Sequence, residues 1–460
     1  MKKLLSLFSS FLIAANLCSA QYKNLLNFNG TNGEYPMSGS LISVGGVLYG
    51  MTSQGGANSD GLIFKIDTNG TGYKDLLDFN RTNGLAPQGS LTLAGGILYG
   101  MTQSGGANNQ GLIFRIDTNG TGYKDILDFK GANGAFPSGG TLTLAGGVLY
   151  GMTFSGGIHS DGNVFKIDTN GAGYKDLLDF NGTNGLYPYA SLTLSGEALY
   201  GMTSQGGANN DGVIFKIDTN GFGYKDLLDF NVTNGTSPRG SLTIAGSLLY
   251  GMTYGGGAIN RGVIFKIDTN GTGYKDVMDF NGPNGQDPGG SLTLSGGVLY
   301  GMTGIGGAHN DGVIFKLDTN GTGYKDLLDF NVTNGNQPLD DLTLTGGVIY
   351  GTTYYGGTKN DGVIFSLRDT TYITGISQIS NNDNQYAIYP NPFTQNLKIV
   401  MDTEEVAIVT LYNLLNEVMG KYTLQKGNND INTSALPPGL YLLQIKTSKE
   451  VLSKKLIKVE

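Results

Sequence analysis

The sequence repeats one unit of about 50 residues seven times. The motif Tyr-Gly-Met-Thr begins at Tyr49 and returns at intervals of 50 or 51 residues, until a final Tyr-Gly-Thr-Thr copy at Tyr350. Each unit also contains a proline, a Gly-Gly pair and a phenylalanine in a Phe-Lys-Ile-Asp-like segment. A fixed period of this length indicates an array of similar supersecondary units.

One unit divides into four short strands. Residues 90–94 alternate in polarity, and Gly95-Gly96 turns the chain into residues 97–102. A loop leads to residues 112–116, and an Asp-Thr-Asn-Gly turn leads into residues 123–129. Apolar residues on both strand faces fit a sheet packed between two neighbours. The unit is therefore an antiparallel meander.

Seven such meanders predict an all-β fold, a seven-bladed β-propeller with four-stranded antiparallel blades. The 76 Gly and 12 Pro residues of the 460 supply tight turns and argue against a helical bundle. A β-helix is the alternative, although its rungs are normally shorter.

The two ends of the array are out of phase. The strand type Tyr-Lys-x-Leu-Leu-x-Phe first occurs at residues 22–28, before any complete unit, and the seventh unit ends after residues 363–367 without such a strand. We therefore expect residues 22–28 to pair with residues 363–367. This pairing removes an exposed edge and closes the ring with the N-terminal strand.

These motifs resemble the Gloeobacter/Verrucomicrobia (GloVer) tandem repeat, whose pattern is Leu-Tyr-Gly-x-Thr, then Gly-Gly, then Gly-x-Ile/Val-Phe. The resemblance covers residues 22–368 and implies a propeller-like extracellular array without an assigned chemistry. The double glycines are also similar to those of kelch repeats, but the tryptophan of that repeat is missing.

The first 20 residues predict a secretory signal peptide. Lys2 and Lys3 precede an apolar stretch, and Cys18-Ser19-Ala20 provides small residues for cleavage after Ala20. The remaining chain, with residues 21–368 as the propeller, has no cysteine and no apolar run long enough to span a bilayer. The net charge of -8 for the whole sequence argues against a nucleic-acid partner.

The C-terminal part has a different pattern. Residues 369–385 are polar and predict a linker, and residues 386–460 alternate as short strands, which predicts a small β-sandwich. Several motifs here resemble the type A sorting domain of the type IX secretion system. Asn416 stands where that family often has Gly, a mild departure. The residues that carry the resemblance are Tyr389, Pro390, Asn391, Pro392, Gly439, Tyr441, Lys454 and Lys455.

This resemblance implies that the type IX machinery is a partner of the tail. It also implies passage through the outer membrane of a Gram-negative bacterium, followed by release or by attachment to the cell surface, usually with removal of the tail. An ordinary sandwich module is the alternative for this segment.

Repetition itself bears on catalysis. Aspartate recurs at the position of Asp78 in six units, with Asn27 in the remaining copy, whereas an active site needs one asymmetric cluster. The Asp-x-Asn-Gly turns lack the later glutamate of a calcium loop. His159 and His309 occur in the same loop of different blades. We therefore predict no catalytic residue, no metal site and no cofactor.

Two functions remain open. The first is a non-enzymatic binding or adhesion module for a glycan or protein ligand, and the second is an extracellular carbohydrate-active enzyme. A recognition surface is expected on the loops Thr-Asn-Gly-x-x-Pro and Gly-Gly-Ala-x-x-Asp, where large residues stand at positions that vary between units. The candidates are Tyr35, Phe136, Phe154, Tyr187, Tyr189, Arg239, Tyr254, Arg261, Tyr354 and Tyr355.

Overall fold

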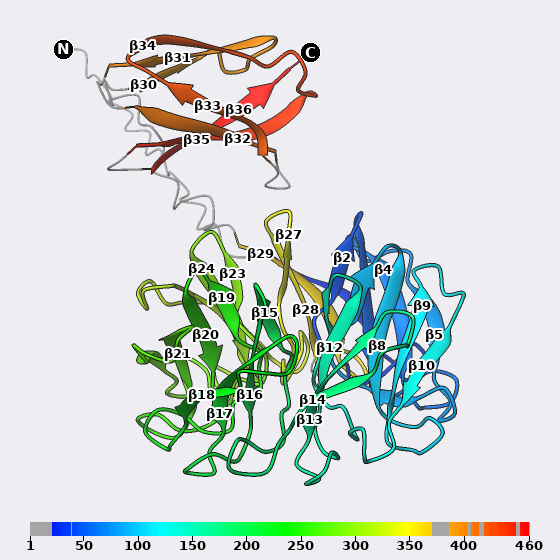
Figure 1. The fold of residues 1–460 in the computed structure, drawn as a ribbon. Coiled ribbons are helices and arrows are strands. Elements are labelled where there is room, and N and C mark those ends of the chain that lie inside the picture. Colours follow the sequence, from blue (N-terminus) through cyan, green and yellow to red (C-terminus); the bar gives the residue numbers. More distant parts are fainter. Residues whose placement is uncertain are drawn as a thin grey trace, which may run out of the picture. The chain divides into compact units, whose positions relative to one another are not determined.

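The structure is a computed structural model that describes residues 21–37, 39–369, 386–402, 406–413, 418–447 and 451–459. The expected signal peptide, Asn416 and all of the expected linker except Asp369 lie outside these residues. The chain divides into two compact units, Tyr22–Leu367 and a second one that contains Arg368–Glu460 (Figure 1).

The first unit, here called the repeat unit, consists of four-stranded antiparallel sheets that we number by their order in the chain. Sheet 1 contains β2 (Ile42–Val44), β3 (Val47–Thr52), β4 (Leu62–Asp67) and β5 (Lys74–Asp78). Sheet 2 contains β7 (Thr92–Ala94), β8 (Ile97–Ser104), β9 (Leu112–Asp117) and β10 (Lys124–Asp128), and the short β6 (Leu85–Pro87) also pairs with β8. Sheet 3 contains β11 (Thr143–Ala145), β12 (Val148–Thr153), β13 (Asn163–Asp168) and β14 (Lys175–Asp179).

The same order continues in the next sheets. Sheet 4 contains β15 (Thr193–Ser195), β16 (Ala198–Thr203), β17 (Val213–Asp218) and β18 (Lys225–Asp229). Sheet 5 contains β19 (Thr243–Ala245), β20 (Leu248–Met252), β21 (Val263–Asp268) and β22 (Lys275–Asp279). Sheet 6 contains β23 (Thr293–Ser295), β24 (Val298–Thr303), β25 (Val313–Asp318) and β26 (Lys325–Asp329).

Sheet 7 combines the two ends of the repeat unit. It contains β27 (Thr343–Thr345), β28 (Val348–Thr353) and β29 (Val363–Arg368), and its outer strand is β1 (Gln21–Asn27), which pairs with β29. The Tyr22 hydroxyl donates a 2.6 Å hydrogen bond to the Asn334 carbonyl, and the Phe28 N–H donates to the Gly362 carbonyl at 3.0 Å. The pairing of the N-terminal strand with residues 363–367 is thus present.

Phenylalanines pack the sheets against one another. A Phe at the end of each outer strand lies edge-to-face against the Phe in the third strand of the next sheet, with ring centroids 5.3 to 5.6 Å apart. The rings of these pairs, such as Phe180 and Phe215, are fully buried. Sheet 7 meets sheet 1 in the same way, through Phe28 and Phe64.

The same packing explains the glycine of the Tyr-Gly-Met-Thr motif. A Cβ atom on Gly201 would lie 2.5 Å from the Cζ atom of Phe215, because that ring covers the backbone of the neighbouring strand. Any larger residue would displace the phenylalanine from the interface between sheets.

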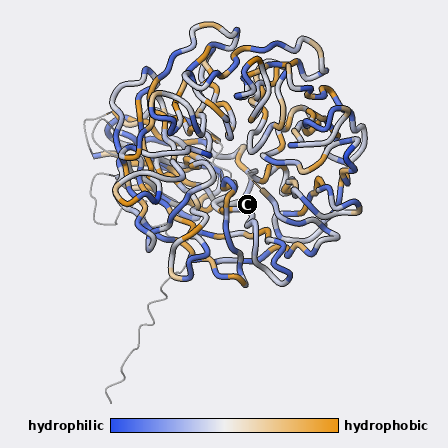
Figure 2. The backbone as a smooth tube through the Cα atoms, turned by 90° about the horizontal axis from the view of Figure 1, so that it is seen from below, coloured by the Kyte–Doolittle hydropathy of each residue, from blue (hydrophilic) through white to orange (hydrophobic). Residues whose placement is uncertain are grey.

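Hydroxyl groups connect the inner strands. Backbone N–H groups donate to Ser, Thr or Asp side chains of the next sheet at 2.5 to 3.0 Å, in the order Ser40, Ser90, Thr141, Ser191, Ser241, Ser291 and Asp341. Thr343 of sheet 7 donates to the Leu41 carbonyl, just before β2 of sheet 1. Hydrophilic and hydrophobic segments are interspersed along the backbone tube (Figure 2).

The C-terminal unit contains two sheets. One has the order β30 (Tyr386–Tyr389), β31 (Asn396–Met401) and β34 (Gly427–Asn432). The other has the order β33 (Val418–Leu424), β32 (Ala407–Tyr412), β35 (Gly439–Lys446) and β36 (Val451–Lys458). Buried residues of both sheets, including Ile399, Val409 and Leu443, form one hydrophobic core. Within the described residues, no helix is long and apolar enough to cross a membrane.

Candidate binding face

Two kinds of loop meet at one end of each sheet of the repeat unit. The entry loop, Thr-Asn-Gly-x-x-Pro, leads into a sheet, and the glycine loop, with its Gly-Gly pair, joins the second and third strands of that sheet. Glu34 and Gln54 exchange backbone hydrogen bonds of 2.9 and 3.2 Å between these loops. Equivalent bonds recur in other sheets, as between Leu186 and Gln205.

The residue before each entry-loop proline has a left-handed backbone. Its φ lies between 50 and 56° at Tyr35, Ala86, Phe136, Tyr187, Ser237, Asp287 and Gln337. A non-glycine residue in this region is uncommon, and the conformation costs on the order of 1–3 kcal/mol.

Hydrogen bonds on both sides hold this conformation. The Tyr187 N–H donates to the Asp161 carbonyl of sheet 3, and the Tyr187 carbonyl accepts from the Ser204 N–H of sheet 4, both at 3.1 Å. The Tyr35 N–H donates to the Asp361 carbonyl in the same way. The side chains at these positions are consequently presented by a rigid backbone that bridges two sheets.

One aromatic cluster lies between sheet 7 and the entry loop of sheet 1, and we name it the Tyr35 cluster. The Tyr35 ring stacks on Tyr354 with centroids 5.1 Å apart, and Tyr355 lies edge-on to Tyr354 at 4.5 Å. Burial raises the pKa of Tyr35, and the neighbouring Glu34 and Asp361 carboxylates add to this effect. The Tyr35 side chain is therefore a neutral phenol.

A second aromatic cluster lies between sheet 3 and the entry loop of sheet 4, and we name it the Phe154 cluster. The Phe154 and Tyr187 rings are parallel within 9° with centroids 4.6 Å apart, and Tyr189 lies edge-on to Phe154 at 6.4 Å. The pKa of Tyr354 is raised by burial, then by its cluster partners, and finally by Tyr189. Tyr189 is therefore within electrostatic range of the Tyr35 cluster.

Sheet 5 contributes a cation rather than an aromatic stack. The Arg239 guanidinium carbon lies 3.7 Å from the ring centroid of Tyr254, and the Arg239 side chain is exposed. Burial raises the pKa of Asp287, while the nearby Arg239 and Arg261 oppose that increase. Arg261 itself donates to the Gln286 side chain. The charges of Arg239 and Asp287 therefore face one another.

Phe136 stands apart from these groups. Its side chain is 37% exposed, and it takes part in neither aromatic cluster within the described part of the chain. The ring contacts thus join neighbouring sheets, and the expected residues form separate groups on this face.

Sequence analysis did not identify a polar group on sheets 2 and 3. The Ser138 hydroxyl donates to Gln88 at 2.8 Å, and the Gln88 amide donates to Gln103 at 3.1 Å. Gln88 and Ser138 occupy the repeat position of Tyr189 and Arg239, directly after the entry-loop proline. That shared position is the signal that could have identified them.

A narrow hollow lies among the inner strands below these loops. Its volume is about 10 Å³, and its lining includes Gly139, Arg239, Leu339 and Asp341. A space of this size holds roughly one water molecule. A larger ligand cannot enter this hollow. A second hollow of about 510 Å³ lies at the loops of sheet 6, and its lining includes Gly282, Gly307 and Asp329.

Two of the acids outside the repeated positions accept hydrogen bonds from neighbouring sheets. Asp340 accepts from the Gly39 N–H at 3.1 Å and from the Thr352 hydroxyl, and Asp341 accepts from the Ser291 N–H at 2.5 Å. Glu197 lies in a hairpin between β15 and β16. Asp340 and Asp341 thus connect sheet 7 to sheets 1 and 6 respectively.

The repeated aspartates cap the glycine loops. The Asp229 carboxylate accepts a 2.6 Å hydrogen bond from the Ala208 N–H, and Asn27 accepts from the Thr358 N–H at 3.1 Å in the seventh copy. Both histidines are exposed loop residues. Within the described residues, no group of three or more His, Cys, Asp or Glu side chains could hold a metal ion.

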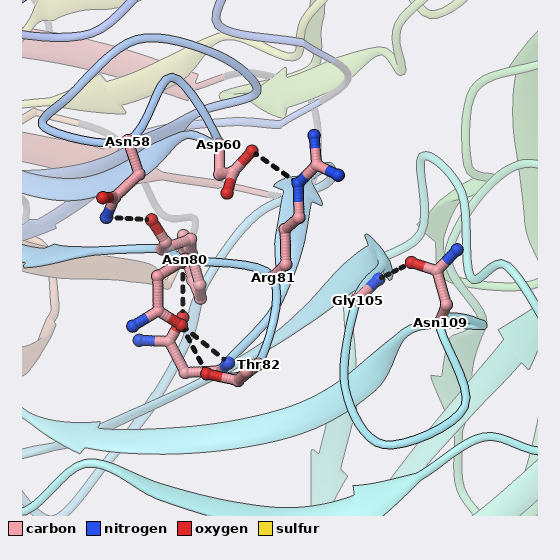
Figure 3. A network of polar contacts seen from close by, with 9 residues as sticks. Asn58, Asp60, Asn80, Arg81, Thr82, Gly105 and Asn109 are labelled. Atoms are coloured by element: carbon pink, nitrogen blue, oxygen red, sulfur yellow. Dashed lines mark hydrogen bonds and ion pairs between the residues drawn. The ribbon is translucent and has the colours of Figure 1, made fainter.

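Figure 3 shows the polar contacts of these loops in sheets 1 and 2. Asn58 donates to the Phe79 carbonyl at 2.8 Å, and the Asn109 side chain accepts from the Gly105 N–H at 3.3 Å. Arg81 pairs with Asp60 at 3.6 Å, and its side chain is 75% exposed. Local side-chain bonds thus shape the loop backbone.

The sorting motif folds onto the last strand of the C-terminal unit. Asn391 accepts from the Ile457 N–H at 2.8 Å, and the Phe393 N–H donates to the Ile457 carbonyl at 2.8 Å. Tyr441 is buried, and its hydroxyl donates to the Pro437 carbonyl at 2.7 Å. Tyr389, Pro390, Pro392 and Gly439 are exposed, and Lys454 donates to the Ile388 carbonyl. The side chain of Lys455 lies outside the described part.

Comparison with known families agrees with both units. The model of the Gloeobacter/Verrucomicrobia repeat matches residues 11–207 and 177–365, and the model of the secretion system C-terminal sorting domain matches residues 387–459. The chain belongs to the Gloeobacter/Verrucomicrobia repeat family and ends in a sorting domain of the type IX secretion system. It is therefore a secreted or cell-surface protein of a Bacteroidetes-type bacterium. None of the curated proteins matches the chain.

Two solved structures from B. thetaiotaomicron are similar in fold. They are extracellular domains described as belonging to a one-component system and to a hybrid two-component system. The first has a TM-score of 0.51 and 13% identity, covering 96% of this chain and 58% of that chain. The second has a TM-score of 0.50 and 13% identity, covering 96% of this chain and 59% of that chain. This chain thus spans less than two thirds of either structure, and the likeness concerns the propeller-like fold alone.

Proposed function

We propose that the protein is a non-enzymatic binding module that acts outside the cell on a seven-bladed β-propeller. In this proposal sheets 1 to 7 are the blades, β1 closes the ring, and the C-terminal unit is a small β-sandwich engaged by the type IX machinery. The Phe pairs between all neighbouring sheets, including sheets 7 and 1, support the closed arrangement.

One observation carries the binding role. The Tyr35 and Phe154 clusters place large aromatic side chains on loops whose left-handed residues are held by hydrogen bonds from two sheets. Such preorganisation lowers the entropy cost of binding, and rigid aromatic side chains provide contact area at low cost. The left-handed backbone recurs at this position in all seven sheets, whereas large aromatic residues occupy it in only some of them.

The alternative of a carbohydrate-active enzyme has less support. Glycoside hydrolysis needs two carboxyl groups flanking one bond. Asp340 and Asp341 accept hydrogen bonds from the backbones of different sheets, and Asp287 faces two arginines. These acids have structural partners that account for their positions.

The test removes three rings from the binding face. Replacing Tyr187, Tyr254 and Tyr354 together by Ala should reduce ligand affinity at least tenfold while thermal unfolding stays cooperative. The ligands screened are a glycan panel and surface proteins, with hydrolase and lyase assays alongside.

Phe222→Ala is the matched control. Phe222 is 70% exposed and lies in the hairpin after β17, at the end of the sheet opposite to the glycine loop. Equal binding by the triple variant and the wild type would place the site elsewhere, and turnover of a glycan would favour the enzyme.

A further inference from the structure

The chemistry of the binding face also bears on the class of ligand, an inference that rests on the proposed function. Three positions in each sheet form the rim of this face: the left-handed residue, the residue after the proline and the first residue of the glycine loop. We use "rim" for these positions below.

The rim combines flat apolar faces with neutral hydroxyl groups. Tyr35, Tyr354 and Tyr187 are half-buried, so part of each ring remains accessible. Burial raises the pKa of Tyr35 and Tyr354, which keeps these phenols protonated and able both to donate and to accept hydrogen bonds. A sugar ring is complementary to such a surface because it has C–H faces and peripheral hydroxyls.

The charges on and beside the rim do not favour an anionic ligand. Arg239 and Asp287 are the charged residues at the rim positions, and Arg239 acts electrostatically on Asp287. Glu34 and Asp361 lie beside Tyr35 and add negative charge, so an anionic ligand gains no net attraction. A guanidinium and a carboxylate can donate to and accept from the hydroxyls of a neutral ligand. The rim thus suits a polar ligand without negative charge.

The shape of the face between the two clusters argues against an inserted anchor there. The hollow among the inner strands has a volume of about 10 Å³, far below the volume of a protein side chain or a monosaccharide. A wider hollow of about 510 Å³ lies at the loops of sheet 6, and neither cluster lines it. Protein partners usually bind through side chains buried in pockets. A ligand that lies flat on aromatic rings needs no such pocket.

We infer that the ligand is a neutral polysaccharide that lies across the rim and contacts the Tyr35 cluster and the Phe154 cluster in the same complex. One hollow among the inner strands is lined both by Ala190, next to Tyr189, and by Leu339 of sheet 7, the sheet that carries Tyr354. Tyr189 also acts electrostatically on Tyr354, so the two clusters border the same part of the binding face. A single polysaccharide molecule that spans both clusters gains affinity from each, because the second contact is intramolecular once the first has formed.

The experiment measures affinity against the length of the saccharide, with the protein as it is exported by the cell. The probes are β-glucan, xylan, mannan and α-glucan polymers, and for each polymer that binds, its disaccharide and hexasaccharide. Polygalacturonate and alginate serve as charged comparisons. Isothermal titration calorimetry should give at least tenfold tighter binding for the hexasaccharide than for the disaccharide of at least one neutral polymer.

Single substitutions then test whether one chain spans both clusters. Tyr354→Ala or Tyr187→Ala should reduce hexasaccharide affinity to within about threefold of the disaccharide value. Arg239→Gln should weaken binding about tenfold, whereas Arg81→Gln, an exposed arginine outside the rim, should have no effect.

Several results would overturn the inference. They are the absence of binding to every neutral polymer, tighter binding to the two polyuronates, and hexasaccharide binding that either tyrosine variant leaves unchanged. If the wild type binds a polyuronate or a protein and the Tyr187/Tyr254/Tyr354 triple variant does not, the proposed binding function stands. The inference that the ligand is a neutral polysaccharide would then be wrong.

Discussion

Asp229 illustrates at the residue scale how repetition separates structure from chemistry. Its carboxylate accepts a short hydrogen bond from the Ala208 N–H of the glycine loop. The seventh copy of the position is Asn27, which accepts the equivalent bond from Thr358. The position therefore requires an acceptor and not a charge.

Asp229→Ala should lower the free energy of unfolding by about 1–2 kcal/mol, because the Ala208 N–H loses its partner. Asp229→Asn should retain most of the stability, since an amide oxygen replaces the carboxylate as in the natural seventh copy. Chemical denaturation of the three proteins measures the difference. Equal losses in both variants would indicate that the charge itself matters.

A second aspartate position behaves differently. Burial and the neighbouring Asp128 raise the pKa of Asp125 to about 6, and burial and Asp329 raise that of Asp326 to about 6. An unfolded aspartate titrates near 3.9. Folding therefore favours the protonated carboxyl groups, and their contribution to stability is lost as the pH rises from about 4 through 6.

The double variant Asp125→Asn/Asp326→Asn should consequently be more stable than the wild type at pH 8, and this advantage should shrink towards pH 4. Asn24 already occupies the equivalent position in β1 and donates to Asn27 at 3.2 Å. Thermal unfolding between pH 4 and 8 measures the effect, with the exposed Asp318→Asn as the control. A stability difference that does not vary with pH would contradict the raised pKa values of Asp125 and Asp326.

At the scale of elements, β1 is the strand on which the array depends. It buries Leu25 and Phe28 between sheets 7 and 1 and pairs with β29. Its Tyr22 ring also stacks on Phe365, with centroids 5.9 Å apart. Removal of β1 exposes both an edge strand and an apolar interface.

Deletion of residues 21–29 should lower the free energy of unfolding by at least about 5 kcal/mol, judged from the cost of removing one buried Phe and one buried Leu. The variant should also aggregate, because β29 becomes an open edge. Lys23→Ala, on the exposed face of the same strand, should change stability by less than about 0.5 kcal/mol. An unchanged unfolding midpoint after the deletion would refute closure by β1.

At the scale of the whole molecule, the two units have separate cores and separate tasks. The repeat unit carries the proposed binding face, and the C-terminal unit carries the sorting motif, whose Asn391 and Phe393 form hydrogen bonds with Ile457. The sorting domain is what places the protein outside the cell.

A protein truncated after Leu367 should therefore accumulate in the periplasm, whereas the full-length chain should reach the cell surface or the medium. Cell fractionation followed by immunoblotting measures the distribution, with Tyr254→Ala in the full-length chain as the control. Mass spectrometry of the exported protein should find peptides from the repeats and few from residues 390–460. Export of the truncated protein at normal levels would contradict the role of the tail.

The sequence by itself determined the repeated unit, its strand order, the partner of the N-terminal strand and the sorting tail. These features depend on local patterns that recur at a fixed interval, and seven copies of one pattern strengthen each assignment. The out-of-phase strand at residues 22–28 is the clearest case, because only one place in the array lacked it.

Only the tertiary structure decided which side chains of the loops meet. Tyr35 lies against Tyr354, and Phe154 lies against Tyr187, because the entry loop of one sheet rests beside the glycine loop of the preceding sheet. The left-handed backbone at Tyr35 and Tyr187 sets the direction of these rings. The repeat period of the sequence specifies neither loop dihedral angles nor contacts between sheets. The sequence therefore indicated the candidate residues but not which of them lie together.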